Sequence, residues 1–262
     1  MAAPIEVPGP LLSDEQREEL HGLIQGADSV ELKLTVPEED QRSTVQALGL
    51  DPLQAEIRQV FFLDTPELSL DQSGLVVRAR RSQKKGDDSV VKLRPVVPSE
   101  LSRSIRKAQS FSIEVDASPS GFVCSGSMKG VPVTGNVHRA VSGKRPLRKL
   151  FSKEQRALFE AHAPEGIGLD DLSVLGPIFV LKLKYAPEGF GRKMVVEMWL
   201  YPDGSRILEL STKCLPQEAF DVAAEARGFL ASKGVNLEGE QQTKTRTALE
   251  FFAKDRQRVG AA

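Results

Sequence analysis

The chain has 262 residues, of which 40% are hydrophobic and 27% charged, and its formal net charge is −1. This balance is typical of a soluble globular protein, and it excludes a global basic field that would draw the chain to DNA or to an acidic membrane surface. No apolar run approaches the roughly 18 residues of a membrane span, and the start of the chain lacks the basic residues of a signal peptide. We therefore expect a cytoplasmic protein whose two cysteines, Cys124 and Cys214, are free thiols.

The first strand of the chain is predicted at 29–36, after a helix at 13–26, because apolar and polar residues alternate there without a break. One face of this strand is aliphatic, and the other carries Glu31 and Lys33. A short helix is expected from 37 to about 48, where proline and acidic residues suit a helix start.

The next strands are predicted at 56–64, 74–81 and 89–96. The last two form a hairpin around the turn at 84–88. The common polar face of this hairpin holds four cations: Arg78, Arg80, Lys92 and Arg94.

A fifth strand is predicted at 110–117, after a short helix at 99–108, and it places Glu114 and Asp116 on one face. From 118 to 177 the alternation lapses into a stretch rich in Gly, Ser and Pro, with one helix at 152–162. A connection of this length is uncommon inside a domain and often functional. We predict that 118–177 is a long insertion lying over one mouth or side of the fold.

The end of the chain returns to alternation and then to helical periodicity. Three strands are predicted at 178–186, 193–200 and 205–213, and C-terminal helices occupy 216–256. The total is eight strands, mostly at hairpin spacing, and eight antiparallel strands can close into a barrel that leaves no exposed edge. We predict an α+β fold in which 1–262 form a single domain: a closed antiparallel eight-stranded barrel with a polar lumen and helices packed outside.

The polar faces of these strands are almost entirely ionic. The cations are Lys33, Arg58, Arg78, Arg80, Lys92, Arg94, Lys182, Lys184 and Lys213. The carboxylates are Glu31, Glu114, Asp116, Glu197 and Glu209. Two like charges about 7 Å apart repel by about 2 kcal/mol at an effective dielectric of 20. Cations that face one another in a barrel therefore call for an anionic ligand. A phosphate chain suits Arg and Lys donors, and the carboxylates could hold Mg²⁺ or Mn²⁺.

A blander interpretation exists for any one strand, because a single Lys-x-Arg pair is usually the solvated side of a sheet. It weakens over eight strands, since cations and acids are segregated on different strands and few Thr, Ser or Gln interrupt them. Trp199, on a polar face, would either stack on a base or pack inside the barrel.

The segments that carry these charges resemble the CYTH superfamily, whose members are also called triphosphate tunnel metalloenzymes. The resemblance covers 28–117 and 178–252, and it rests on Glu31-x-Lys33 together with 60–66, 74–80, 91–94, 113–116, 181–184, 207–210 and 243–249. It implies an eight-stranded tunnel that binds triphosphate through Lys and Arg and holds one or two divalent metals through carboxylates. The nine cations above would then bind phosphate, the five carboxylates would bind metal, Lys33 and Glu114 would be catalytic, and Arg246 would bind substrate at a tunnel mouth.

Three functions follow from the resemblance. The first is a metal-dependent phosphohydrolase acting on inorganic triphosphate or a nucleoside triphosphate, the second a class IV adenylate cyclase, and the third a non-catalytic polyphosphate or nucleotide sensor. Ser29 and Ser211 stand where the family pattern has glutamates, so one metal or two remains open. The oligomeric state, monomer or dimer, is also left open by the sequence.

Overall fold

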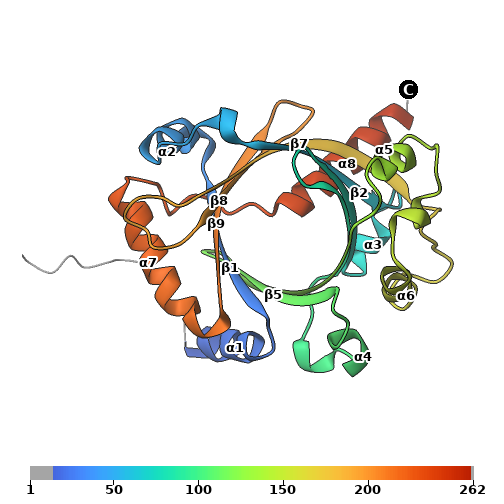
Figure 1. The fold of residues 1–262 in the computed structure, drawn as a ribbon, viewed down its shortest axis with the longest axis horizontal. Helices are drawn as coiled ribbons and strands as arrows, with labels where there is room; N and C mark the ends of the chain where they lie inside the picture. Colours follow the sequence, from blue (N-terminus) through green and yellow to red (C-terminus); the bar gives the residue numbers. More distant parts are fainter. Residues whose placement is uncertain (1–13, 261–262) are drawn as a thin grey trace, which may run out of the picture.

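The computed structural model describes residues 14–260, and within them nine strands form a closed barrel (Figure 1). The strands are β1 Ser29–Val36, β2 Glu56–Asp64, β3 Leu75–Ser82, β4 Gly86–Leu93, β5 Phe111–Ser118, β6 Gly121–Gly130, β7 Ser173–Tyr185, β8 Met194–Leu200 and β9 Arg206–Cys214. Around the barrel their order is β1-β5-β6-β4-β3-β2-β7-β8-β9. The predicted barrel with surrounding helices is therefore confirmed.

Two features of the barrel differ from the prediction. Strand β6 is a ninth strand, and β1 pairs with β5 in parallel, so the sheet is mixed rather than antiparallel throughout. The parallel pair aligns Ser29 with Glu114 and Glu31 with Asp116. This pair closes the ring, and it brings the acids of the first and fifth predicted strands side by side.

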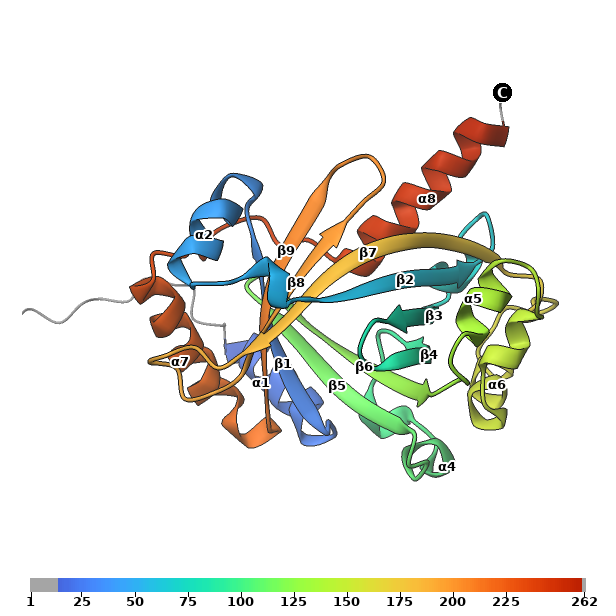
Figure 2. The same ribbon diagram turned by 45° about the horizontal axis from the view of Figure 1, so that its top comes forward.

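The helices of the described residues lie mainly on the outside of the ring (Figures 1 and 2). They are α1 Asp14–Gln25, α2 Gln41–Ala47, α3 Ser69–Gln72, α4 Arg103–Arg106, α5 Asn136–Val141, α6 Lys153–Glu160, α7 Ala219–Ser232 and α8 Lys244–Gly260. Short 3-10 helices are η1 Glu38–Asp40, η2 Pro52–Gln54, η3 Pro98–Glu100, η4 Leu147–Leu150 and η5 Pro216–Glu218. Residue 13, where the first helix was expected to begin, lies outside the described residues. None of the described helices combines the length and apolarity needed to cross a membrane.

The aliphatic faces of the strands point outward and are buried by these helices. Leu75, Val91 and Val115 belong to one apolar cluster that includes residues of α1, α5 and α6. Leu34 and Leu210 pack in a second cluster with α7. Because period-2 alternation puts successive side chains on opposite faces, burial of the aliphatic face outside turns the ionic face inward.

The segment 118–177, expected as an insertion outside the barrel, supplies β6 and the first residues of β7. Strand β6 has the sequence GFVCSGSMKG, whose small residues hide its alternation. Gly126 is needed there, because a Cβ at this position would lie 2.4 Å from the Phe111 ring. The rest of the segment, with α5, η4 and α6, packs on the outer side of the barrel (Figure 2).

One end of the barrel interior is filled by apolar side chains. Val60, Phe62, Trp199 and Ile207 from the inner faces of the strands pack against Ala248, Leu249 and Phe252 of α8. Figure 1 shows the start of α8 inside the ring and the rest of the helix leaving it. The expectation that all helices pack outside is therefore wrong for the first turns of α8, which plug this end.

Candidate functional site

The inner faces of the strands bring most of the predicted ionic residues together in one interior. Lys33 of β1 lies 2.8 Å from Asp116 of β5, and Lys182 of β7 lies 2.5 Å from Glu197 of β8. Charges on strands that are not neighbours also affect one another, since Glu197 influences the ionisation of Arg78 on β3. The charged faces thus share one space enclosed by the barrel.

Three carboxylates form the acidic centre of this space. Glu31, Glu114 and Asp116 each offer one oxygen, and these oxygens all lie within 4.8 Å of one another. Oxygen donors of this kind suit Mg²⁺ and Mn²⁺, which prefer carboxylates and often bind through only a few of them. The donor set therefore fits a hard divalent cation.

Asp116 is the most heavily paired carboxylate of the three. Its oxygens lie 2.8 Å from Lys33 Nζ, 2.7 Å from Arg94 Nη1 and 3.9 Å from Lys92 Nζ. Burial opposes ionisation of Asp116, but the charges of Lys33, Lys92 and Arg94 lower its pKa to about 2. Burial alone would lower the pKa of Lys33, yet Asp116 and Glu31 raise it above its usual range. Both groups are therefore charged at neutral pH.

The two serines that replace expected carboxylates contact the carboxylates that remain. Ser211 Oγ donates to Glu31 Oε1 at 3.1 Å, and Ser29 Oγ donates to Glu114 Oε2 at 3.4 Å. Glu114 also forms an ion pair with Lys213, whose side chain is 50% exposed. Neutral hydroxyls thus orient the remaining acids without adding negative charge.

Glu197 and Glu209 are separated from this acidic centre by their partners. Glu197 accepts from Lys182 through Oε1, and from Lys244 at 2.6 Å and Trp199 Nε1 at 3.2 Å through Oε2. Glu209 accepts from Lys244 at 2.7 Å. Burial opposes ionisation of Glu197, but Lys244 and Lys182 hold its pKa well below the usual range. Glu197 and Glu209 are therefore paired with lysine ammonium groups, and they do not belong to the acidic triad of the described residues.

Arg78 differs from the other interior arginines because it has no ion pair in the part of the chain that the structure describes. Arg58 pairs with Glu56 at 3.0 Å, and Arg80 pairs with Asp88 at 2.8 Å. The Nε of Arg78 is buried and lacks a hydrogen-bond partner. Burial, and then the charge of Arg80, lower the pKa of Arg78 to about 9. At neutral pH it remains a partly buried cation that Asp88 and Glu197 favour only from a distance, without an ion pair among the described residues.

Lys92 is another interior cation whose charge is only partly balanced by a carboxylate. Its ammonium lies 3.9 Å from Asp116, beyond hydrogen-bond distance, and Lys33 and Arg94 compete for the same carboxylate. Burial, opposed by Asp116 and reinforced by Lys33 and Arg94, lowers the pKa of Lys92 to about 8. Arg78 has no ion pair among the described residues and Lys92 shares Asp116 with two other cations, so this side of the barrel carries an excess of positive charge.

Two predicted substrate ligands lie away from this centre. Arg246 is 76% exposed and pairs with Glu250 one turn along α8, so it does not join the interior cluster, and its role at the substrate stays a prediction. Lys184 is exposed near the end of β7. Lys244, two residues before Arg246, is the interior cation that the sequence prediction missed. Its signal was present, because the resemblance included the segment 243–249.

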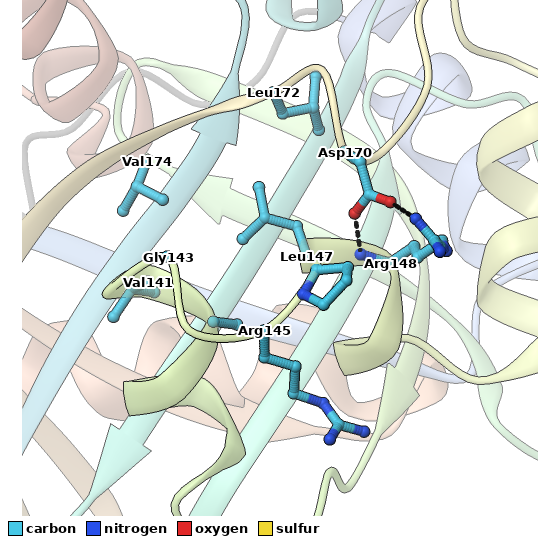
Figure 3. Close-up of a pocket in the computed structure, with 10 residues that line it drawn as sticks. Val141, Gly143, Arg145, Leu147, Arg148, Asp170, Leu172 and Val174 are labelled. Atoms are coloured by element: carbon cyan, nitrogen blue, oxygen red, sulfur yellow. Dashed lines mark hydrogen bonds and ion pairs between the residues drawn. The ribbon is translucent and has the colours of Figure 1, made fainter.

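A separate cavity of about 540 Å³ lies outside the barrel, between α5, η4 and the start of β7 (Figure 3). Val141, Leu147, Leu172 and Val174 line it, together with an ion pair between Arg148 and Asp170. None of the predicted ionic residues lines this cavity. The candidate site is therefore the barrel interior, where charged side chains occupy the space.

No protein-family model matches the sequence, and no curated protein matches it. Solved structures do match. A candidate adenylyl cyclase from Hippeastrum, described as having a dominant triphosphatase activity, is 17% identical with a TM-score of 0.61, over 83% of this chain and 93% of that one. A candidate adenylate cyclase from Bacillus halodurans is 12% identical with a TM-score of 0.57, over 84% of this chain and 98% of that one.

The fold therefore defines the chain as a closed tunnel of β-strands with an ionic interior. More particularly, it is the fold shared with these two solved structures, as the resemblance found in the sequence implied. At 17% and 12% sequence identity, the similarity to these structures concerns the fold alone.

Proposed function

We propose that this chain is a divalent-metal-dependent phosphohydrolase that acts on inorganic triphosphate or a nucleoside triphosphate inside the barrel. The observation that carries the proposal is Arg78, a partly buried guanidinium whose Nε is buried and which has no ion pair among the described residues, in an interior that also holds Lys92. Buried charges are normally paired, so this side of the barrel is built for an anion that supplies the missing negative charge. Triphosphate offers several anionic oxygens in a row.

The interior cations would then divide into two groups. Arg78, Arg80 and Lys92, on the hairpin β3–β4, would bind phosphate oxygens, with Arg58 and Lys182 beside them on β2 and β7. Arg94 and Lys33 are held by Asp116 at 2.7 and 2.8 Å, so they are positioned before substrate enters. Lys184 and Lys213 would meet the anion at the rim. A preorganised set of donors stabilises charge that develops in the transition state, without further rearrangement.

The acidic triad supplies the metal site of the proposal. Glu31, Glu114 and Asp116 would hold Mg²⁺ or Mn²⁺, and a bound divalent ion supplies neutralisation of phosphate charge. Glu197 and Glu209, expected from the sequence as ligands, are held by Lys244 instead. The proposed metal ligands are therefore three of the five predicted acids.

The reaction we propose is an in-line attack of water on the terminal phosphorus. A bond forms between the water oxygen and phosphorus, the bridging P–O bond breaks, and its electron pair leaves on the departing diphosphate. Glu114 would orient the water and accept its proton, and Lys33 would stabilise charge on the transferred phosphoryl group. Both side chains face the interior, Glu114 beside Ser29 and Lys33 beside Asp116.

A cyclase would need an open pocket for a nucleoside base, and Trp199 was the candidate platform. In the structure Trp199 is 4% exposed, its ring lies 5.1 Å from Lys244 Nζ, and Phe62 packs against it. These neighbours enclose the Trp199 ring, so packing inside the barrel is better supported for it than stacking on a base. The hydrolase is thus better supported than the cyclase. The description of the Hippeastrum protein, a dominant triphosphatase activity, also favours the hydrolase over the cyclase.

The deciding experiment incubates the purified protein with triphosphate or ATP, with and without Mn²⁺, and measures phosphate, pyrophosphate and cyclic AMP. We expect metal-dependent release of phosphate that is lost in Glu114→Gln. Formation of pyrophosphate together with cyclic AMP would identify a cyclase instead. Binding of triphosphate without turnover at any metal concentration would identify a sensor.

A further inference from the structure

Two carboxylates face each other directly across neighbouring strands of the barrel. Glu197 of β8 and Glu209 of β9 are register partners in the antiparallel pair, and Glu209 is only 6% exposed. Like charges directly opposite on a sheet are destabilising, and burial strengthens their repulsion. A cation must therefore lie between them for both to remain ionised.

Lys244 provides that cation from the first residue of α8. Its ammonium lies 2.6 Å from Glu197 and 2.7 Å from Glu209, and the side chain is 12% exposed. Burial would lower the pKa of Lys244, but Glu197 and Glu209 raise it above the usual range. The lysine is therefore held in the polar interior as a charged group between Glu197 and Glu209.

The position of Lys244 is fixed by the packing of α8. The backbone carbonyl of Lys244 accepts a hydrogen bond from Tyr201 Oη at 3.2 Å, and one turn later Ala248 and Leu249 are fully buried in the plug. Before the helix, Gln241 Oε1 accepts from the backbone N–H of Thr35 at 2.9 Å. The ammonium thus belongs to an anchored element.

We propose that Lys244 is a built-in cation that takes the place of a second divalent ion, so that the chain binds one divalent ion, at Glu31, Glu114 and Asp116. The inference deepens the proposed function and rests on its metal site. Both oxygens of Glu197 are already occupied, by Lys182 and by Lys244. The next inward residue after Glu209 is Ser211, which offers a hydroxyl that donates to Glu31. No free carboxylate remains beside Lys244, among the described residues, to draw a second ion.

The test counts bound Mn²⁺ by electron paramagnetic resonance and calorimetry, without substrate, so that it is independent of turnover. We expect one ion per chain in the unmodified protein and a second, weaker one in Lys244→Met, which keeps an unbranched side chain one atom shorter and removes its charge. The matched control is Arg246→Met on the exposed side of α8, which should bind one ion.

Two further variants decide the question if Lys244→Met does not fold. Glu209→Gln should leave Mn²⁺ affinity within twofold of the unmodified protein, whereas Glu114→Gln should weaken it at least tenfold. Two ions in the unmodified protein, or loss of the ion in Glu209→Gln, would overturn the inference. If the unmodified protein bound no Mn²⁺, the proposed metal site would fail, and the gain or lack of an ion in Lys244→Met would still decide the role of Lys244.

Discussion

Replacing Arg78 with methionine should change triphosphate binding and protein stability in opposite directions. Arg78 is a partly buried cation without an ion pair in the described part of the chain, so the folded protein is stabilised little by its charge. Methionine fills a similar volume without the charge and adapts its shape to irregular surroundings. The ligand-free variant should therefore be at least as stable as the unmodified protein.

The magnitude follows from the environment of the guanidinium. A pKa that burial and Arg80 lower from 12.5 to about 9 corresponds to at most about 5 kcal/mol against the charged form, and partial solvent exposure reduces this to roughly 2–3 kcal/mol. A charge-assisted hydrogen bond to phosphate contributes about 1.5–3 kcal/mol. Loss of Arg78 should thus raise the Kd for triphosphate about 10- to 150-fold.

Urea denaturation measures the stability term, and calorimetry with triphosphate in EDTA measures the binding term. Arg81→Met is the matched control, because Arg81 follows on the same hairpin but its guanidinium donates to Gln59 at 2.7 Å. This control should keep the affinity within twofold. An Arg78→Met variant that loses more than about 2 kcal/mol of stability while its triphosphate affinity is unchanged would show that Arg78 has a structural role and does not bind triphosphate.

Three other predictions test single groups. Lys92, with its pKa lowered to about 8, loses its charge as pH rises from 7 to 9, so metal-free triphosphate affinity should fall over that range and Lys92→Arg should flatten the profile in calorimetry. Asp116→Asn leaves Arg94 unpaired and Lys33 with Glu31 as its one remaining partner among the described residues, and it should lower the free energy of unfolding in EDTA by about 3 kcal/mol, whereas Glu250→Gln, at an exposed pair, should not change it measurably. Arg246→Ala should keep triphosphate affinity within twofold, and a tenfold loss would place this arginine back in the site.

The fold was predictable where alternation was strong. The bounds predicted for β1 and β2 are those observed, because β1 alternates without a break and the apolar run of β2 ends at Asp64, just before Thr65-Pro66. Strand β6 was missed because Gly126 and Ser125 look like loop residues, although tight packing against Phe111 and β4 requires a small side chain there. The parallel pairing of β1 with β5 could not be read from spacing, since hairpin logic assigns neighbours by sequence order alone.

The sequence predicted which residues face the barrel interior, but it did not predict which of them contact one another. Side-chain parity correctly placed Lys33, Arg78 and Asp116 on inner faces, because a strand's two faces are fixed once one is buried. Which acid meets which cation depends on strand order and on where α8 enters the barrel, and strand parity determines neither of them. Lys244 entered the interior from a helix, where strand parity gives no information, and it took Glu197 and Glu209 out of the predicted metal set.

The central claim is that the ionic faces of the strands form a binding site for triphosphate inside the barrel. A crystal structure of the protein with triphosphate, prepared without divalent ions so that hydrolysis does not intervene, tests it most directly. We expect phosphate oxygens within hydrogen-bond distance of Arg78 and Lys92. Triphosphate bound only on the outer surface, such as in the cavity beside Arg148, with the barrel interior unchanged, would contradict it.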